Sequence, residues 1–286
     1  HRFYTSLLFP VLRLTPPHVF RYYQGLSEAD ALRASVREAE EMVNAEKDTL
    51  AALVVEPLMQ GAAGMWAQPA EYVAALGEIC RHNSVLLILD EVATGFGRTG
   101  KMFACEHAGV TPDILCLAKG ITGGYLPLAA TLATEEIFSA FLGEYKEYKT
   151  FFHGHTYTGN PLGCAAALAN LELFEHENIV EKMQPRITYL QKRLNEEFVS
   201  LAHVSDVRQW GFMVGIELVE DQASRKKYPP EKRIGHRVIL EARKRSVMIR
   251  PLGDIIILMP PLTITDEELA MLLDVVYDCI REVTEK

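Results

Sequence analysis

The segment Leu86–Met102, LLILDEVATGFGRTGKM, joins a run of apolar residues to an acidic pair and a glycine-rich stretch. An apolar run that stops at charged residues is typical of a buried strand, which here ends at Asp90. Gly95 to Lys101 then has the spacing G-x-x-x-x-G-K of a phosphate-binding loop. The segment therefore suggests two kinds of site: Asp90 holds Mg²⁺ beside a nucleotide, or it faces a different positive charge.

The chain before this segment contains a second strand of the same kind. LAALVVEP, residues 50–57, is an apolar run stopped by Glu56 and a proline. Between the two runs, residues 69–83 place apolar side chains at helical spacing on one face. A strand, a helix and another strand in this order indicate parallel strands, so Glu56 and Asp90 are expected at the same edge of one sheet.

The next apolar run brings a lysine to that edge. In PDILCLAKG, residues 112–120, an apolar strand is followed by Lys119. Near-continuous apolar strands separated by helices are typical of an α/β sheet with both faces covered. Ligands of such sheets bind beyond the carboxyl ends of the strands. Asp90 and Lys119 are therefore expected to face the same ligand.

The sequence pattern changes near His176. An alanine-rich helix is expected to begin at Asn160, and charged helices with short apolar strands follow from residue 176 to the end. We predict a large domain with a mostly parallel sheet over residues 1–175. Residues 176–286 are expected to form a smaller C-terminal α/β domain.

Composition excludes several classes of function. The 286 residues carry a formal net charge of −9, which disfavours nucleic acid and anionic membranes as partners. No apolar run reaches the roughly 20 residues that span a bilayer. The N-terminus has no initiator methionine and no cleavable signal, so we expect the chain to begin inside a longer protein. The five widely spaced cysteines favour free thiols in a cytoplasmic protein.

The nucleotide hypothesis meets two mechanical problems. A phosphate-binding loop of this type needs a hydroxyl after its lysine to hold Mg²⁺, and Met102 occupies that position. The loop should also follow a strand directly and open a helix, whereas Gly95 comes five residues after Asp90. An ATPase therefore stays only as a weak alternative.

Lys119 offers Asp90 a different partner. A lone lysine after a strand is usually a solvated strand end, but here it follows Asp90 by 29 residues and precedes GITGGYLP. Pyridoxal phosphate chemistry needs a lysine amine to bind the cofactor and move protons, and a carboxylate to keep the pyridine nitrogen protonated. The glycines allow the backbone to turn sharply beside the lysine. The pair therefore predicts a pyridoxal phosphate enzyme.

Three longer stretches resemble the class III aminotransferases. They are residues 86–131, which contain Asp90 and Lys119, together with FFHGHTYTGNPLGCAAALANL and MIRPLGDIIILMPPL. The resemblance runs from about Leu50 to the C-terminus. It implies the fold of the type I pyridoxal phosphate transferases. GRTGKMFACEH and RPLGD point to the branch of the family that acts in biotin synthesis.

The resemblance also implies the residues that hold the cofactor. Lys119 matches the lysine that binds it covalently, and Asp90 matches the partner of the pyridine nitrogen. Val92 matches an aliphatic side chain that packs on the ring, although a plain packing role fits it nearly as well. His155 and Thr156 match a segment that reaches the cofactor phosphate of the other subunit.

Two further positions match substrate-binding residues of the family. Gly154 matches a backbone position in contact with the substrate. Arg250 matches the arginine that holds the carboxylate of the keto acid, for which a planar, bidentate guanidinium is well suited. Taken alone, Arg250 also fits a surface strand end, and Glu56 fits a structural role. His153 and His155 lack an acidic third ligand, so no metal site is expected.

The resemblance implies a cytoplasmic homodimer with active sites at the subunit interface. Its reaction would convert 8-amino-7-oxononanoate to 7,8-diaminononanoate, with S-adenosylmethionine or lysine as amino donor. An aminotransferase of the same class for other ω-amino acids is the first alternative. Residues 1–49 show no counterpart of the family's phosphate-binding Gly-Ser loop or of its ring-stacking aromatic residue. The chain therefore resembles an N-terminally truncated member, and an inactive fragment is the last alternative.

Overall fold

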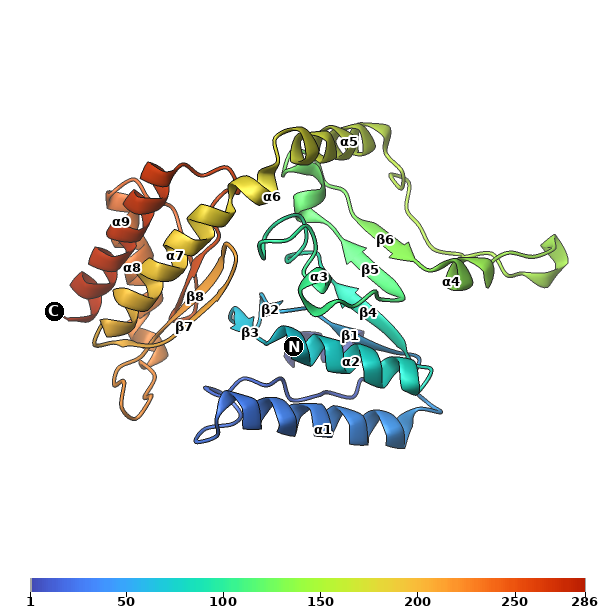
Figure 1. The fold of residues 1–286 in the computed structure, drawn as a ribbon, viewed down its shortest axis with the longest axis horizontal. Coiled ribbons are helices and arrows are strands. Elements are labelled where there is room, and N and C mark those ends of the chain that lie inside the picture. Colours follow the sequence, from blue (N-terminus) through green and yellow to red (C-terminus); the bar gives the residue numbers. More distant parts are fainter. Residues whose placement is uncertain (1, 286) are drawn as a thin grey trace.

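The computed structural model describes residues 2–285, which form two four-stranded sheets and a short two-stranded ribbon (Figure 1). The first sheet has the order β1-β4-β5-β6, and the second has the order β7-β8-β10-β9. The strands of the first sheet are β1 (Ala52–Val55), β4 (Leu86–Asp90), β5 (Ile114–Leu117) and β6 (Ala130–Ala133). Those of the second are β7 (Val204–Trp210), β8 (Met213–Leu218), β9 (Arg250–Leu252) and β10 (Ile255–Leu258).

The first sheet is mostly parallel, as the sequence predicts. β1 pairs with β4 and β4 with β5 in parallel, and only β6 runs antiparallel to its neighbour β5. The expected helix between the first two strands is α2 (Ala70–His82). It buries Tyr72, Val73 and Leu76 under the sheet, and α1 (Glu28–Glu46) packs against α2 from outside.

The other face of the first sheet differs from the sequence prediction. Val54 and Leu86 point to this face and are 63% and 37% exposed. Continuous apolar strands predicted helices over both faces. Within residues 2–285 the helices cover one face, because α1 and α2 lie on the same side of the strands (Figure 1).

The second sheet is antiparallel throughout and is backed by three helices. These are α7 (Gln184–Glu196), α8 (Ile234–Lys244) and α9 (Asp266–Thr284). Asn160 begins α5 (Pro161–His176) as predicted, since its side chain accepts hydrogen bonds from the first turn. The domain boundary predicted after residue 175 falls at the end of α5 and stays a prediction.

The ribbon and the remaining helices are short and mostly belong to connections. They are β2 (Met59–Gln60), β3 (Trp66–Ala67), α3 (Cys105–Ala108), α4 (Glu135–Ser139), α6 (Ile179–Lys182), η1 (Arg2–Leu7), η2 (Lys119–Thr122), η3 (Tyr145–Glu147), η4 (Phe198–Ser200) and η5 (Pro230–Lys232).

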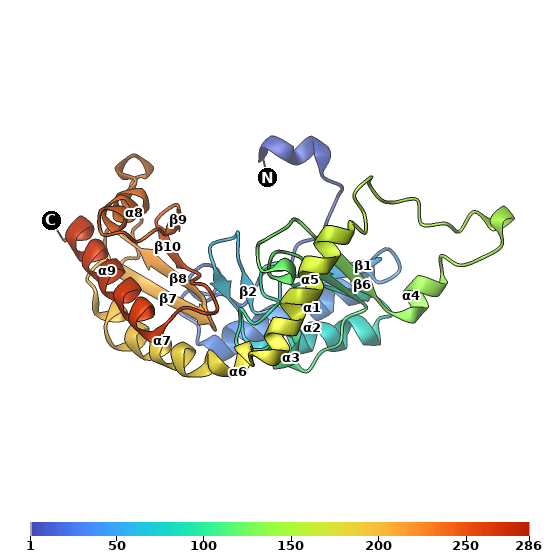
Figure 2. The same cartoon turned by 90° about the horizontal axis from the view of Figure 1, so that it is seen from above.

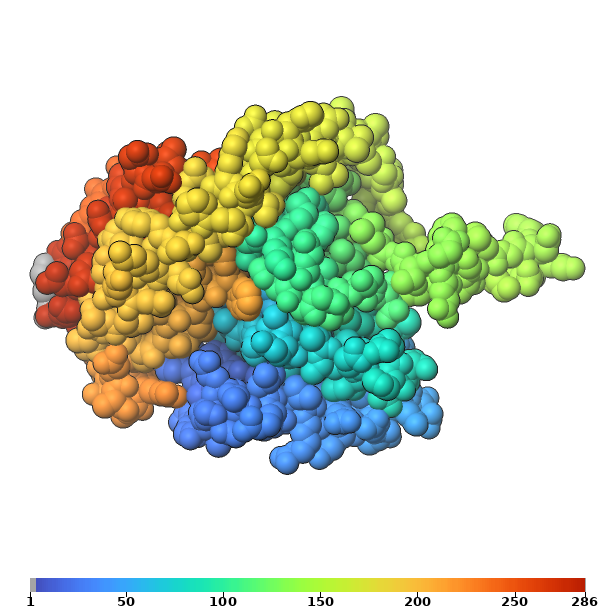
Figure 3. Space-filling model, viewed as in Figure 1, coloured from blue at the N-terminus to red at the C-terminus, as the bar shows by residue number. Residues whose placement is uncertain are grey.

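Two segments stand away from the body. The arm, residues 135–159, carries α4 and projects far beyond the first sheet (Figure 3). It exposes a set of aromatic side chains: Phe138, Tyr145, Tyr148, Phe151, Phe152 and Tyr157. The N-terminal η1 also stands clear of the sheets (Figure 2). No helix within residues 2–285 is long and apolar enough to cross a membrane.

Candidate active site

Asp90 and Lys119 lie at the carboxyl ends of neighbouring parallel strands. Asp90 is the last residue of β4 and is paired with Cys116 of β5, and Lys119 follows β5 by two residues. The main chain turns sharply here, because Lys119 begins the short helix η2 with a φ of 45°. A positive φ is uncommon for a residue with a side chain and often marks a functional position. The structure thus places both residues at the edge that the sequence predicts.

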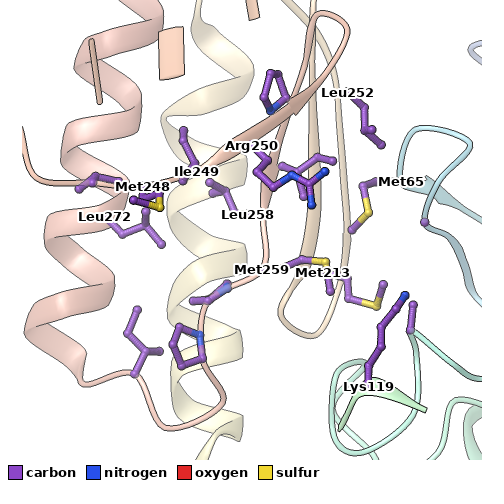
Figure 4. A pocket seen from close by; sticks show the side chains of 18 of the residues that line it. Met65, Lys119, Met213, Met248, Ile249, Arg250, Leu252, Leu258, Met259 and Leu272 are labelled. Carbon is purple, nitrogen blue, oxygen red and sulfur yellow. The ribbon is translucent and has the colours of Figure 1, made fainter. Parts of the chain in front are cut away.

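A cavity of about 780 Å³ lies between the two sheets and receives Lys119. Figure 4 shows Lys119 entering from one side and Arg250 from the other, with Met213 and Met259 between them. Its volume is in the range of small-molecule sites. The apolar wall is rich in methionine: Met65, Met213, Met248, Met259 and Met271 all line it. The sequence shows these methionines only as scattered residues, so this wall could not be predicted.

Glu56 is the third charged group of this edge. It follows β1, lines the cavity, and accepts a hydrogen bond from Gly61 N–H at 2.9 Å. Burial raises the pKa of the Glu56 carboxyl above its ordinary value, and the charge of Asp90 acts in the same direction. The Gly61 N–H and the Lys119 ammonium act in the opposite direction. The charges of Asp90 and Lys119 therefore both act on the Glu56 carboxyl.

Arg250 lines the cavity from the edge strand of the second sheet. It begins β9, where it pairs with Ile257 of β10, and its side chain is exposed. The guanidinium makes no hydrogen bond or ion pair with any residue from 2 to 285. A cationic fork without a partner beside an apolar wall suits the carboxylate of an aliphatic ligand.

Asp90 stands at the same sheet edge as Lys119 but does not line the cavity, and the remaining predicted residues do not line it either. Val92 donates its N–H to Asp90 Oδ1 at 3.1 Å, and the neighbouring Ala93 lines the cavity instead. Gly154, His155 and Thr156 are exposed at the base of the arm, where Thr158 Oγ1 accepts a hydrogen bond from His155 N–H. The sequence-based roles of these residues stay predictions.

The glycine-rich stretch from Gly95 to Lys101 has the wrong surroundings for a nucleotide. It leads into α3, a helix of four residues, and Lys101 Nζ donates to Glu106 O at 3.1 Å. A phosphate-binding lysine would instead point at the ligand from the start of a long helix. No group of three metal-ligating side chains occurs among the described residues.

The fold and the lysine–aspartate edge of the first sheet match a known class of protein. The sequence model of the class III aminotransferases matches residues 5–280, and the chain belongs to this family. Among its relatives is the adenosylmethionine-8-amino-7-oxononanoate aminotransferase of Nitratidesulfovibrio vulgaris, which is 53% identical over 285 residues. The match covers all of this chain and 52% of the relative.

Solved structures agree with this assignment. The adenosylmethionine-8-amino-7-oxononanoate aminotransferase of Methanocaldococcus jannaschii matches with a TM-score of 0.91 and 44% identity, over 99% of this chain and 62% of that one. An amine transaminase from an uncultivated Pseudomonas species, in its PLP-bound form, matches with a TM-score of 0.88 and 38% identity, over 94% and 61%. The predicted fold class is therefore confirmed. The chain spans between about half and just under two thirds of these relatives.

Proposed function

We propose that this chain carries the catalytic lysine of a pyridoxal phosphate aminotransferase that converts 8-amino-7-oxononanoate to 7,8-diaminononanoate in biotin synthesis. The observation that carries the proposal is the position of Lys119 and Arg250 on opposite walls of one apolar cavity. The names of two similar proteins, both adenosylmethionine-8-amino-7-oxononanoate aminotransferases, support this choice of substrate. The amino donor, S-adenosylmethionine or lysine, stays open.

The residues of the sheet edge fit pyridoxal phosphate. A primary amine and a carboxylate stand at the ends of adjacent strands, as covalent attachment and pairing with a protonated ring nitrogen require. When bound, the cofactor supplies a carbonyl that takes up an amino group and a ring that withdraws electrons. Lys119 would hold it, and Asp90 would pair with its ring nitrogen.

Each charged residue then has a distinct task. Lys119 takes a proton from the amino-bearing carbon of the donor and later returns one to the acceptor, as general base and then acid. Arg250 binds the acceptor's carboxylate, and its planar fork fixes the orientation of that end. The methionine wall buries the aliphatic chain between the two ends and excludes water from it.

We further propose a homodimer whose arms complete the site of the partner. Tyr145 and Phe152 of the arm are 92% and 81% exposed, which is unusual for large aromatic side chains. Gly154, His155 and Thr156 lie at the base of this arm and outside their own chain's cavity. In a dimer these residues would reach the cofactor of the other subunit. Val92 would instead pack beside the ring of the cofactor held by its own chain.

A cytoplasmic location agrees with the state of the cysteines. All five are free, and Cys80, Cys105 and Cys279 are buried. Burial raises the pKa of Cys80 to about 11 and contributes most to raising that of Cys105 to about 12. Protonated, buried thiols of this kind are stable in a reducing compartment.

A panel of substrates tests the proposed reaction. The full-length gene product is loaded with pyridoxal phosphate, and 8-amino-7-oxononanoate is offered with S-adenosylmethionine or lysine. We expect 7,8-diaminononanoate by mass spectrometry with at least one of these donors. Ornithine and 4-aminobutyrate, paired with 2-oxoglutarate, should give less than about a hundredth of that rate, because discrimination of this size is common for mismatched substrates. The reverse preference would assign the chain to another branch of the family.

A further inference from the structure

The bridging loop, residues 91–104, leads from β4 to α3 and contacts both sheets. Its two ends are tied together by Glu91, whose fully buried carboxylate accepts hydrogen bonds from Ala104 N–H and Cys105 N–H at 2.6 and 2.8 Å. Within the loop, Gly97 N–H donates to Met102 O at 3.2 Å. Because a buried, satisfied network of this kind is stiff, the loop is expected to move as one body.

One end of this body supports the turn at Lys119. Phe96 is 3% exposed, with a φ of 55°, and lies directly against Gly120. A Cβ atom on Gly120 would come within 2.8 Å of Phe96 Cβ, so the two segments are in contact without a gap. The bridging loop therefore sets the backbone position from which Lys119 projects.

The other end holds the second sheet. Gly211, with a φ of 56°, forms the two-residue turn between β7 and β8, and Phe212 N–H donates to Arg98 O at 2.9 Å. A Cβ atom on Gly211 would lie only 2.4 Å from Arg98 O. The turn and the loop thus meet through their main chains, and no side chain fits between them.

Two side-chain hydrogen bonds secure the same junction. Gln184 at the start of α7 donates its Nε2 to Gly100 O at 2.8 Å. Arg98 Nη1 donates to the carbonyl of Pro260, which follows β10, at 2.5 Å. The bridging loop is therefore hydrogen-bonded to the turn between β7 and β8, to α7 and to the segment after β10.

Paired strands of the second sheet connect the turn at Gly211 to Arg250. Gly215 of β8, four residues beyond Gly211, is paired with Ile257 of β10. Ile257 is paired in turn with Arg250 of β9. A displacement of the turn at Gly211 would move these strands together, and it would move Arg250 relative to Lys119.

We propose that the bridging loop fixes the distance between Lys119 and Arg250 and so selects the length of the keto acid. Gly211 is a positioning residue in this proposal, which rests on the proposed function of the two charged groups. Insertion of a methyl group at Gly211 would push the junction apart by about 1 Å, since carbon atoms pack at about 3.5 Å or more. Misplacement of this size costs about 10²-fold in rate.

The test compares Gly211→Ala with Gly109→Ala in the cofactor-loaded, full-length gene product. Gly109 also has a positive φ, 63°, but a Cβ atom there meets nothing within 4 Å, so this variant reproduces the backbone strain alone. The acceptors are 8-amino-7-oxononanoate and homologues with one methylene fewer or more. Cofactor absorbance, melting temperature and the rate with an amine donor that has no carboxylate are measured in parallel.

Gly211→Ala should lower kcat/KM for 8-amino-7-oxononanoate about 10²-fold and weaken the preference for its chain length. Its cofactor absorbance and its rate with the amine donor should stay within about twofold of those of Gly109→Ala. Equal kcat/KM and equal length preference in the two variants would overturn the proposal.

If Gly211→Ala does not fold, Gln184→Ala decides, because at an exposed position it removes the hydrogen bond to Gly100 O, along with one to Val180 O, without adding bulk. A weakened length preference in that variant supports the proposal, and an unchanged preference overturns it. A wild-type protein that binds no cofactor would instead contradict the proposed function.

Discussion

The two four-stranded sheets are supported in different ways. The second sheet packs against three helices, and side chains from its core such as Phe198, Ile216 and Leu273 are completely buried. Among the described residues, helices cover one face of the first sheet, and Val54 on the other face is 63% exposed. The more weakly covered sheet is nevertheless the one that carries Lys119.

This difference suggests a division of tasks between the sheets. The first sheet gathers Glu56, Asp90 and Lys119 at its edge, where burial and the charge of Asp90 raise the pKa of the Glu56 carboxyl and the charge of Lys119 lowers it. Within residues 2–285, the strands of the second sheet bring one charged side chain to the cavity, that of Arg250, from an antiparallel frame. Chemistry would then belong to the first sheet and substrate selection to the second. Changes in each sheet should therefore give different kinds of defect.

The largest effect on substrate binding that leaves cofactor binding unchanged is expected from a substitution in the second sheet. Arg250→Met keeps an unbranched, mostly aliphatic side chain but removes the guanidinium, and the exposed position should tolerate it. We expect KM for 8-amino-7-oxononanoate to rise about 10²-fold, because charge-assisted hydrogen bonds contribute about 1.5–3 kcal/mol. Steady-state kinetics measures this value, and cofactor absorbance should not change.

An acceptor without the carboxylate serves as the control. Wild-type protein should use this analogue about 10²-fold less well than the natural acceptor, whereas Arg250→Met should use both equally. If the variant still preferred the carboxylate, another group would bind that end. If its cofactor absorbance were lost, the division between the sheets would be wrong.

A smaller effect is expected from Glu56 in the first sheet. Its carboxyl has a raised pKa in the folded chain, so the folded state binds more protons than the unfolded state between the two pKa values. Stability is therefore lost as pH rises through this window, above the ordinary pKa of a glutamate. In Glu56→Gln this contribution is absent, and the melting temperature should fall less between pH 4.5 and 7.

Glu172→Gln is the matched control for this measurement, since Glu172 is an exposed carboxylate on α5. Its pH profile of melting temperature should follow that of the wild type. An identical profile for Glu56→Gln would show that the Glu56 carboxyl is not stabilised in its protonated form. A changed KM for the keto acid would show that Glu56 also selects the substrate.

Much of the first sheet could be predicted from the sequence because its signals are local. Apolar runs define β1, β4 and β5, and the positions of Asp90 and Lys119 follow from parallel connections between them. The spacing of the apolar residues in α2 likewise predicted which face of this helix packs against the sheet. These features need no knowledge of distant contacts.

The junctions between the two sheets could not be predicted in this way. The turn at Gly211 meets Arg98 across more than a hundred residues, and only a positive φ and a close approach explain the glycine. The methionine wall also assembles from separate elements. The open face of the first sheet escaped prediction because apolar strands indicate a covered face without indicating what covers it.

Borohydride reduction of the cofactor-loaded, full-length gene product tests the central claim most directly. It converts the bond between the lysine amine and the cofactor to a stable tag, which peptide mass mapping then locates. The tag should fall on Lys119 alone, should persist in Lys101→Ala, and should be lost in Lys119→Ala together with all turnover. A tag on another lysine, or a tag and turnover retained in Lys119→Ala, would contradict the account.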